Sequence, residues 1–357
     1  MAKKKKKTTA ARKTLIVLCV VLGIILAALV AGTVYAEYLL GKVNYVDSEA
    51  TTPTLSQEEI DALYQPDEDW EEGEETEPEE VEFFETEPDE AEEAGSEETL
   101  PVFKTTSDNI KTFLLIGADD SEENGVSRTD SIILCTFNKT KKTITLTSFM
   151  RDIYVDIPGY KKNRINVPYS LGGLSLLHKT LEKNFGVVPD GTVIINFNNF
   201  VNLIDYVGGI EIELTSQEAK YIRQQYSGAD TVEGVNLLNG WEALFYSRYR
   251  RSGGGDLDRT NRQRIVLSTL LHKYKNLSKA ELLGVMDDVL PMVTTDMSKE
   301  DILGYFLSFF PMLAEAELVS TRIPVDNGYY LAKREGMSVV VADMAKNRKH
   351  LQSILTE

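Results

Sequence analysis

The chain is poor in the residues that build disulfides, zinc sites and histidine-dependent catalytic triads. Its 357 residues include two cysteines and three histidines. Cys19 lies in a long apolar run near the N-terminus and Cys135 lies in a separate strand-like run, so we expect no disulfide between them. Without a Cys-x-x-Cys or His-x-x-x-His pattern, a zinc site or a Ser/His/Asp triad has little support. The folded part must therefore be stabilised by its own hydrophobic core.

Basic residues are absent between Asp47 and Glu98, a stretch that contains 24 Asp or Glu residues. The negative charge of this stretch alone is larger in magnitude than the formal net charge of the whole chain, which is −18. From Pro101 to the C-terminus, 30 Lys or Arg residues nearly balance 31 Asp or Glu residues. The acidity therefore belongs to one segment, and we expect residues 37–103 to form a disordered, self-repelling acidic linker.

Charged residues are also absent from residues 14–36, which read TLIVLCVVLGIILAALVAGTVYA. At about 1.5 Å per residue this run spans a hydrocarbon core of about 30 Å, so it predicts one transmembrane helix. Residues 1–13 carry seven Lys or Arg, which predicts a single-pass cell membrane protein with a cytosolic tail and an extracellular domain. A cleaved signal peptide is the alternative, although its apolar core is usually only about 7–15 residues long. Beside a membrane helix the lysines are a topology signal, and we expect no nucleic-acid partner.

Residues 104–357 alternate short apolar runs with helical patterns. Five runs, rich in β-branched and aromatic residues, predict strands at 113–117, 131–137, 143–149, 192–197 and 211–215. Helical patterns cover 170–184, 198–206, 239–249, 259–275, 279–290, 299–313 and 339–355. This alternation predicts the α/β class: a single domain with a central mixed β-sheet covered by helices.

The segment from Ser247 to Arg264 contains six arginines and no lysine. In a helix that starts near Arg259, the side chains of Arg259, Arg262 and Gln263 share a face with later core residues. Because burying an arginine without a partner is costly, a bound anion or facing carboxylates must balance this face. Arg248 also has a simpler interpretation, since cations are favoured near a helix C-terminus. Arginine forks beside a glycine-rich turn and a helix N-terminus nevertheless favour phosphate binding.

A second group of polar residues lies between the first two predicted strands. Asp119 follows the first strand, and Arg128 and Asp130 precede the second. Carboxylates at strand ends beside a phosphate site would hold Mg²⁺, which prefers oxygen ligands; the alternative is an acidic surface turn. Arg151 and Asp152 add an Arg–Asp pair at the end of the third strand.

Six blocks of this sequence together resemble the LytR-CpsA-Psr family of bacterial cell-envelope proteins. In order they read GADD followed by SRTDSI as the first block, then SFMRDIYVDIPGY, RINVPYSLGG, YVGGIEI, LNGWEALFYSRYR and DLDRTNRQR. The resemblance covers a core of residues 110–275, with a continuation to residue 357. It implies a phosphotransferase that takes a glycopolymer from a polyprenyl-pyrophosphate carrier and attaches it to peptidoglycan through a phosphodiester, in a Gram-positive-type envelope. The polymer would be a teichoic acid, a capsule or a similar glycan.

The resemblance also implies roles for individual residues. Asp119 and Asp130 would bind Mg²⁺, with Mn²⁺ as the alternative, and one carboxylate would assist the attacking hydroxyl. Arg151 would act in both catalysis and binding. The implied pyrophosphate-binding residues are Arg128, Arg151, Arg164, Arg248, Arg250, Arg259, Arg262 and Gln263. The sequence departs from the family pattern at Met150, where Pro is usual, and this leaves the placement of Arg151 open.

Two other functions stay open. One is a sensor that binds polyprenyl-linked envelope precursors without turnover, and the other is a polyprenyl-pyrophosphate hydrolase. Asp119 and Asp130 favour an enzyme, because a pure binder needs the arginines more than a metal. The apolar runs 174–181 and 194–204 are expected to pack in the core, with the wall of a polyprenyl groove as the alternative. No protein partner can be inferred.

Overall fold

The computed structural model describes residues 32, 34–48, 55–64, 103–104, 107–118, 129–250, 255–275, 287–313 and 315–356. The predicted cytosolic tail and nearly all of the predicted transmembrane run lie outside these residues, as do residues 65–102 of the predicted linker. Within the described ranges, no helix is long and apolar enough to cross a membrane.

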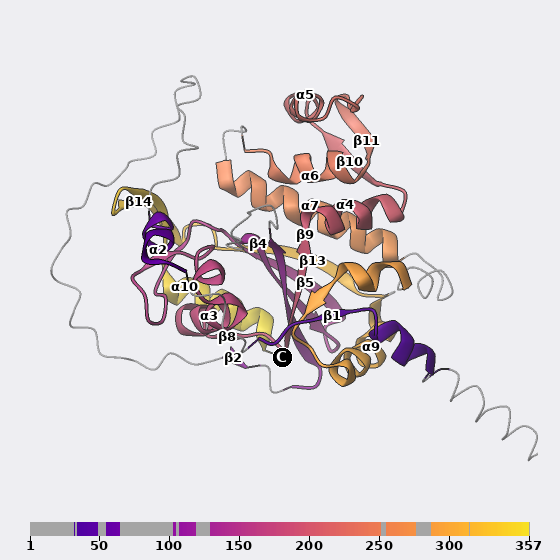
Figure 1. The fold of residues 1–357 in the computed structure, drawn as a ribbon, viewed down its shortest axis with the longest axis horizontal. Coiled ribbons are helices and arrows are strands. Elements are labelled where there is room, and N and C mark those ends of the chain that lie inside the picture. The colour runs from indigo at the N-terminus through magenta and orange to yellow at the C-terminus, as the bar shows by residue number, and fades with distance from the viewer. Residues whose placement is uncertain are drawn as a thin grey trace, which may run out of the picture.

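A seven-stranded mixed sheet forms the centre of the domain, as predicted (Figure 1). Its strands, in spatial order, are β1 (Asn44–Tyr45), β12 (Thr294–Thr295), β9 (Gly191–Asn196), β3 (Ile110–Ala118), β4 (Thr129–Asn138), β5 (Thr143–Phe149) and β13 (Glu317–Ile323). The strands β3, β4 and β5 are antiparallel neighbours, whereas β3 with β9 and β5 with β13 are parallel pairs. The predicted strand at 211–215 instead belongs to a separate two-stranded antiparallel sheet, in which β10 (Ile210–Leu214) pairs with β11 (Gly234–Leu238).

The longer helices are α3 (Pro168–Phe185), α4 (Phe197–Tyr206), α5 (Ser216–Gln225), α6 (Gly240–Arg248), α7 (Gly255–Lys275), α9 (Lys299–Leu313) and α10 (Met344–Leu355). Most match predicted helices, although much of the predicted helix 279–290 lies outside the described residues. The helix predicted over 339–355 is wrong at its start. Residues Met337–Ala342 form strand β15, which pairs with β14 (Tyr329–Arg334), because its run of valines suits a half-buried strand.

Helices cover both faces of the sheet. On one face, Leu114 and Leu134 pack with Leu177 of α3 and Leu351 of α10. The opposite face packs against side chains of α7 and α9 in a second cluster. A third cluster is formed by side chains of helices α4, α5, α6 and α7 and of strands β10 and β11. The run 174–181 lies in the first cluster, which agrees with its expected role in the core.

The start of the predicted linker is ordered against the domain, so the linker expected over residues 37–103 begins too early. Leu39, Leu40 and Val43 are buried, and β1 pairs in parallel with β12. Leu63, which follows the short helix α2 (Gln57–Ala62), is also buried, and its carbonyl accepts a hydrogen bond from Asn163 Nδ2 at 3.1 Å. The physical reason is that apolar residues are interspersed among the acidic residues up to position 64, and burying them stabilises the docked state.

Candidate active site

Four strands of the central sheet have an end at one common edge. β5 ends at Phe149, and its parallel neighbour β13 ends at Ile323, whose carbonyl accepts a hydrogen bond from Met150 N at 2.9 Å. β4 begins opposite the end of β5, and β3 ends there too, because Gly117 lies opposite Ser131 near the start of β4. Loops leaving these strands therefore converge at the carboxyl ends of the parallel strands, where α/β sheets usually bind ligands.

Two further elements bring charged residues to this edge. β6 (Tyr154–Val155) and β7 (Asn163–Arg164) form a short hairpin directly after β5, and Ile165 N donates to Ile153 O at 2.9 Å. The hairpin carries Arg164. The first turns of α7 carry Asp256 and Arg259, which are one helical turn apart.

Five charged side chains meet here: Arg151, Asp152, Arg164, Asp256 and Arg259. Arg151 Nε lies 3.5 Å from Asp152 Oδ1 and 3.7 Å from Asp256 Oδ1. Arg164 Nη1 lies 3.8 Å from Asp152 Oδ1, and Arg259 Nη2 lies 2.6 Å from Asp256 Oδ1. All five are largely buried, and Arg259 is only 2% exposed. We call this group the arginine–aspartate cluster.

The cluster is suited to an anion that carries phosphate. Three guanidinium groups share two carboxylates, and the low dielectric of a buried site strengthens each charged interaction. Planar guanidinium forks match phosphate oxygens in pairs. The three arginines were predicted from the sequence as binding residues, whereas Asp152 and Asp256 were not predicted as site residues. Their signals were the Arg–Asp doublet after a strand and the spacing of three residues between Asp256 and Arg259.

Burial raises the pKa of the Asp152 carboxyl above its ordinary value. The positive charge of Arg151 opposes this rise, the negative charge of Asp256 adds to it, and the charges of Arg164 and Arg259 lower the pKa again. Burial and the negative charge of Asp256 therefore disfavour the charged form of the Asp152 carboxyl, and the three arginines partly offset this effect.

Of the two predicted metal ligands, only Asp130 has a described backbone, which lies near the start of β4 at the same edge. Asp119 and Arg128 lie outside the described residues, and of Asp130 only the backbone, within β4, is described. Thr129, just before it, is buried, and its Oγ1 donates to Asn166 O at 3.4 Å, two residues beyond Arg164. Among the side chains that the structure describes, no three His, Cys, Asp or Glu residues converge as metal ligands.

Arg262 binds different residues from Arg259, although the two lie one turn apart on α7. Its Nε donates to Glu218 Oε1 at 2.6 Å, and its Nη1 donates to Tyr249 O at 3.0 Å. Glu218 Oε2 in turn accepts hydrogen bonds that cap the N-terminus of α5 at Thr215. Arg262 thereby fixes the backbone at Tyr249, which lies between the predicted residues Arg248 and Arg250.

The remaining predicted residues lie on α6, α7 and the turn between them. Arg248 is exposed, with its guanidinium 4.7 Å from the centre of the Phe197 ring. Arg250 is exposed just before residues that the structure does not describe, and Gln263 is half-buried. Arg264, in the same helix, is buried, and this burial lowers the pKa of its guanidinium to about 10, assisted by the charge of Arg322.

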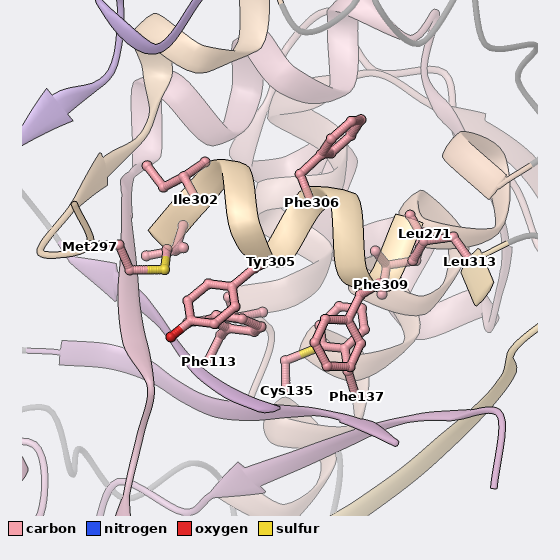
Figure 2. Close-up of a pocket in the computed structure, with 12 residues that line it drawn as sticks. Phe113, Cys135, Phe137, Leu271, Met297, Ile302, Tyr305, Phe306, Phe309 and Leu313 are labelled. Atoms are coloured by element: carbon pink, nitrogen blue, oxygen red, sulfur yellow. The ribbon is translucent and has the colours of Figure 1, made fainter. Parts of the chain in front are cut away.

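An apolar pocket of about 320 Å³ lies between the sheet and two helices (Figure 2). Phe113 and Leu115 of β3 and Cys135 and Phe137 of β4 form its sheet wall. The opposite wall comes mainly from α9, through Ile302, Tyr305, Phe306, Phe309 and Leu313, and Leu271 of α7 also contributes. Val193 and Met297 complete the lining. The runs 174–181 and 194–204 were named above as alternative walls of a polyprenyl groove. Neither run contributes a residue to the lining of this pocket.

Helix α7 connects the pocket with the cluster. Positions four residues apart stack on one side of a helix, which puts Arg259, Gln263, Leu267 and Leu271 in one row. Arg259 belongs to the cluster, Leu267 packs against the sheet, and Leu271 lines the pocket. At a rise of about 1.5 Å per residue, the row is about 18 Å long. It runs from a charged end to an apolar end.

A model of the LytR_cpsA_psr family matches residues 80–353. The chain therefore belongs to the LytR-CpsA-Psr family, as the sequence blocks predicted. The matched region extends beyond the expected core of residues 110–275 and includes β13, the hairpin β14–β15 and most of α10.

Curated relatives of this chain carry two kinds of name. Regulatory protein MsrR of Staphylococcus aureus (strain COL) is 35% identical over 226 residues, which are 62% of this chain and 67% of MsrR. Polyisoprenyl-teichoic acid–peptidoglycan teichoic acid transferase TagU of Bacillus licheniformis is 30% identical over 243 residues, which are 66% of this chain and 76% of TagU.

Solved structures agree in fold. The structure of TagT bound to LIIa-WTA has a TM-score of 0.58 and 27% sequence identity, and the match covers 71% of this chain and 94% of that one. The structure of the LytR-CPS2A-psr family protein YwtF (TagT) with bound octaprenyl pyrophosphate lipid has a TM-score of 0.54 and 26% identity, with 71% and 93% covered.

Proposed function

We propose that this chain is a membrane-anchored, Mg²⁺-dependent phosphotransferase that moves a glycopolymer from a polyprenyl-pyrophosphate carrier to peptidoglycan. The observation that carries the proposal is the row on α7, which links a buried arginine–aspartate cluster to an apolar pocket. A polyprenyl pyrophosphate has the same division into a charged head and an apolar chain. A relative of the same fold is described with bound octaprenyl pyrophosphate lipid, which supports this choice of ligand.

The arginines of the cluster bind the pyrophosphate in this proposal. Arg151 lies two residues after β5, whereas Arg164 lies in β7 and Arg259 in α7, so they surround a ligand from three directions. Arg128, Arg248, Arg250 and Gln263 add contacts from the neighbouring loop and helices. Arg262 acts as a positioning residue, because it holds the Tyr249 carbonyl and so the turn that carries Arg248 and Arg250.

The reaction exchanges one phosphorus–oxygen bond for another. A peptidoglycan hydroxyl attacks the phosphorus that bears the glycopolymer, and the bond from this phosphorus to the bridging oxygen breaks. The polyprenyl phosphate leaves with the bridging oxygen, and a carboxylate accepts the hydroxyl proton. The product is a phosphodiester between the polymer and peptidoglycan. The arginines stabilise the charge that develops on the leaving group, which is the main task of a protein in phosphoryl transfer.

Mg²⁺ is the proposed cofactor, with Mn²⁺ as the alternative. Carboxylate and diphosphate oxygens are the ligands that these ions prefer. In sequence, Asp119 directly follows the end of β3 and Asp130 is the second residue of β4, and these two strand ends lie at the edge that carries the cluster. When bound, the ion would neutralise diphosphate charge. The arginines would share this task, and the protein groups around the ion would also orient the two substrates.

The test uses the full chain purified in detergent, incubated with a polyprenyl-pyrophosphate-linked glycopolymer, peptidoglycan and Mg²⁺ or EDTA. We expect mass spectrometry to detect polymer joined to peptidoglycan through a phosphodiester, with release of polyprenyl phosphate. Arg259→Lys and Asp119→Ala should reduce this product strongly, and EDTA should abolish it. Release of free polymer phosphate instead would identify a hydrolase.

A second candidate is a binding protein that reports on envelope precursors without turnover. The relative named Regulatory protein MsrR favours it. In that case the full chain should retain the lipid-linked polymer, no bond should be cleaved under any metal condition, and Asp119→Ala should bind as well as wild type does. Cleavage that depends on Asp119 would exclude this candidate.

A further inference from the structure

Helix α9 is apolar on two opposite sides. Its inward side forms a wall of the pocket through Ile302, Tyr305 and Phe309. Its outward side exposes Leu303, Leu307 and Pro311, which are four residues apart and therefore form one stripe. Leu307 is 65% exposed. A helix at the surface of a soluble domain normally has a polar outer side, so this stripe calls for a covering surface.

The end of the predicted membrane run lies beside this helix. Residues 34–40 are helical, and Leu39 and Leu40 are buried against the domain. Lys299 is the first residue of α9, and its Nζ lies 3.9 Å from Glu37 Oε2. In addition, β1 pairs with β12, which ends just before α9. Figure 1 shows this N-terminal helix next to α9. The described end of the predicted membrane run, residues 34–36, is therefore continuous with a segment that packs beside α9.

Residues around the stripe suit the surface of a bilayer. Tyr35 and Tyr38 are exposed on the same helical segment, their rings are stacked, and Tyr38 is 53% exposed. Tyrosine is enriched where a membrane meets water. Lysines flank α9 at both ends: Lys299 is its first residue, and Lys139 lies 4.4 Å from the Phe309 ring centre and donates to Ser308. Acidic Glu300 and Asp301 are confined to the first turn.

We propose that the outer stripe of α9, Leu303, Leu307 and Pro311, lies on the lipid bilayer that holds the predicted transmembrane helix. The inference rests on the proposed membrane anchor and adds a second, interfacial contact to it. The docked segment 34–48 then fixes the domain in one orientation, with the helix that walls the pocket against the lipid. A polyprenyl chain in that bilayer is separated from the pocket by one helix, so it can enter without crossing water.

Nitroxide scanning in the full chain, reconstituted in nanodiscs of phosphatidylglycerol and phosphatidylethanolamine, tests the proposal. The label is placed on Leu307→Cys and, as a matched control, on Val235→Cys, both with Cys19→Ser. Val235 is an apolar residue of β11 that is 70% exposed. It lies on the two-stranded sheet that β11 forms with β10. Cys135 is buried, and burial raises its thiol pKa to about 12, so we expect it to react poorly with the label.

We expect the Leu307 label to collide several-fold more often with oxygen, which enters lipid, than with the water-soluble nickel complex NiEDDA. The Val235 label should show the opposite ratio. Equal access of NiEDDA to both labels would overturn the proposal. Protection of the Leu307 label from both reagents would overturn it too, because it indicates a protein partner. A label on native Cys19 reports the anchor separately, so a lipid-exposed Cys19 with a water-exposed Leu307 rejects only the docking.

Discussion

Arg262 and Glu218 form a buried ion pair, with Nε 2.6 Å from Oε1 and both side chains less than one-tenth exposed. The pair joins α7 to α5, and Glu218 also caps α5. Arg262 therefore has a structural role that its position in an arginine-rich motif does not reveal. The distinction between Arg262 and Arg259, one turn apart on the same helix, leads to separate predictions for stability and for binding.

Arg262→Ala should destabilise the fold by about 3–5 kcal/mol, because it leaves the Glu218 carboxylate buried without its partner. The measurement is the free energy of unfolding from urea denaturation. Glu218→Gln/Arg262→Met should recover most of the loss, since glutamine can still cap α5 and no buried charge remains. Arg248→Ala, at an exposed position, should cost less than about 1 kcal/mol. Equal stability of Arg262→Ala and wild type would show that the pair is not formed.

The pH dependence of stability should change in Asp152→Asn. Burial raises the pKa of Asp152 in the folded state, so between the unfolded and folded pKa values the folded chain binds more protons than the unfolded chain does. This carboxyl therefore makes the fold less stable as the pH rises through that window. Relative to wild type, Asp152→Asn should gain stability as the pH is raised from about 4. An opposite slope in paired urea titrations would mean that the arginines outweigh burial.

Transfer activity should depend on Mg²⁺ through Asp119 and Asp130. Asp119→Asn and Asp130→Asn should each raise the Mg²⁺ concentration needed for half-maximal activity and lower the maximal rate by at least about tenfold, because a lost charge ligand removes stabilisation of a developing anion. Asp120→Asn, in the same loop, is the matched control and should behave as wild type. A metal titration that gives identical curves for all four proteins would refute the assignment of the ligands.

Leu271→Trp should fill the pocket and weaken binding of octaprenyl pyrophosphate by at least about tenfold. Each methylene group excluded from an apolar site costs about 0.8 kcal/mol, so two groups suffice for that effect. Inorganic pyrophosphate, which has no apolar chain, should bind equally to both proteins. Val235→Trp provides the control for a bulky residue at the surface. If Leu271→Trp binds the lipid normally, the chain occupies another part of the protein.

Local sequence patterns were enough to predict most of the sheet and its helices. The run at residues 143–149 has β-branched residues bounded by turns, and it forms β5 over the same residues. Residues 339–341 were assigned to a helix because their apolar run leads directly into one. Only the pairing of β15 with β14 decides that they form a strand, and such pairing is not visible in a single segment.

The site was predictable in its residue types but not in its partners. Arg151, Arg164 and Arg259 were identified from motifs, yet their carboxylate partners Asp152 and Asp256 lie about a hundred residues apart in sequence and meet only because α7 packs near the end of β5. The ordered segment before residue 64 was missed for a related reason. Its apolar residues, such as Leu39 and Leu63, are too scattered to predict an element, and the surface that buries them is not visible in the sequence.

The most direct test of the account measures binding of octaprenyl pyrophosphate to the full chain and to Arg259→Lys, which keeps the charge but loses the planar fork. Arg334→Lys, outside the cluster, is the control, and urea unfolding verifies that each variant is folded. A charged hydrogen bond contributes about 1.5–3 kcal/mol, so Arg259→Lys should weaken binding by about 10- to 100-fold while the control is unchanged. Equal affinity of all three folded proteins would contradict the assignment of the cluster as the pyrophosphate site.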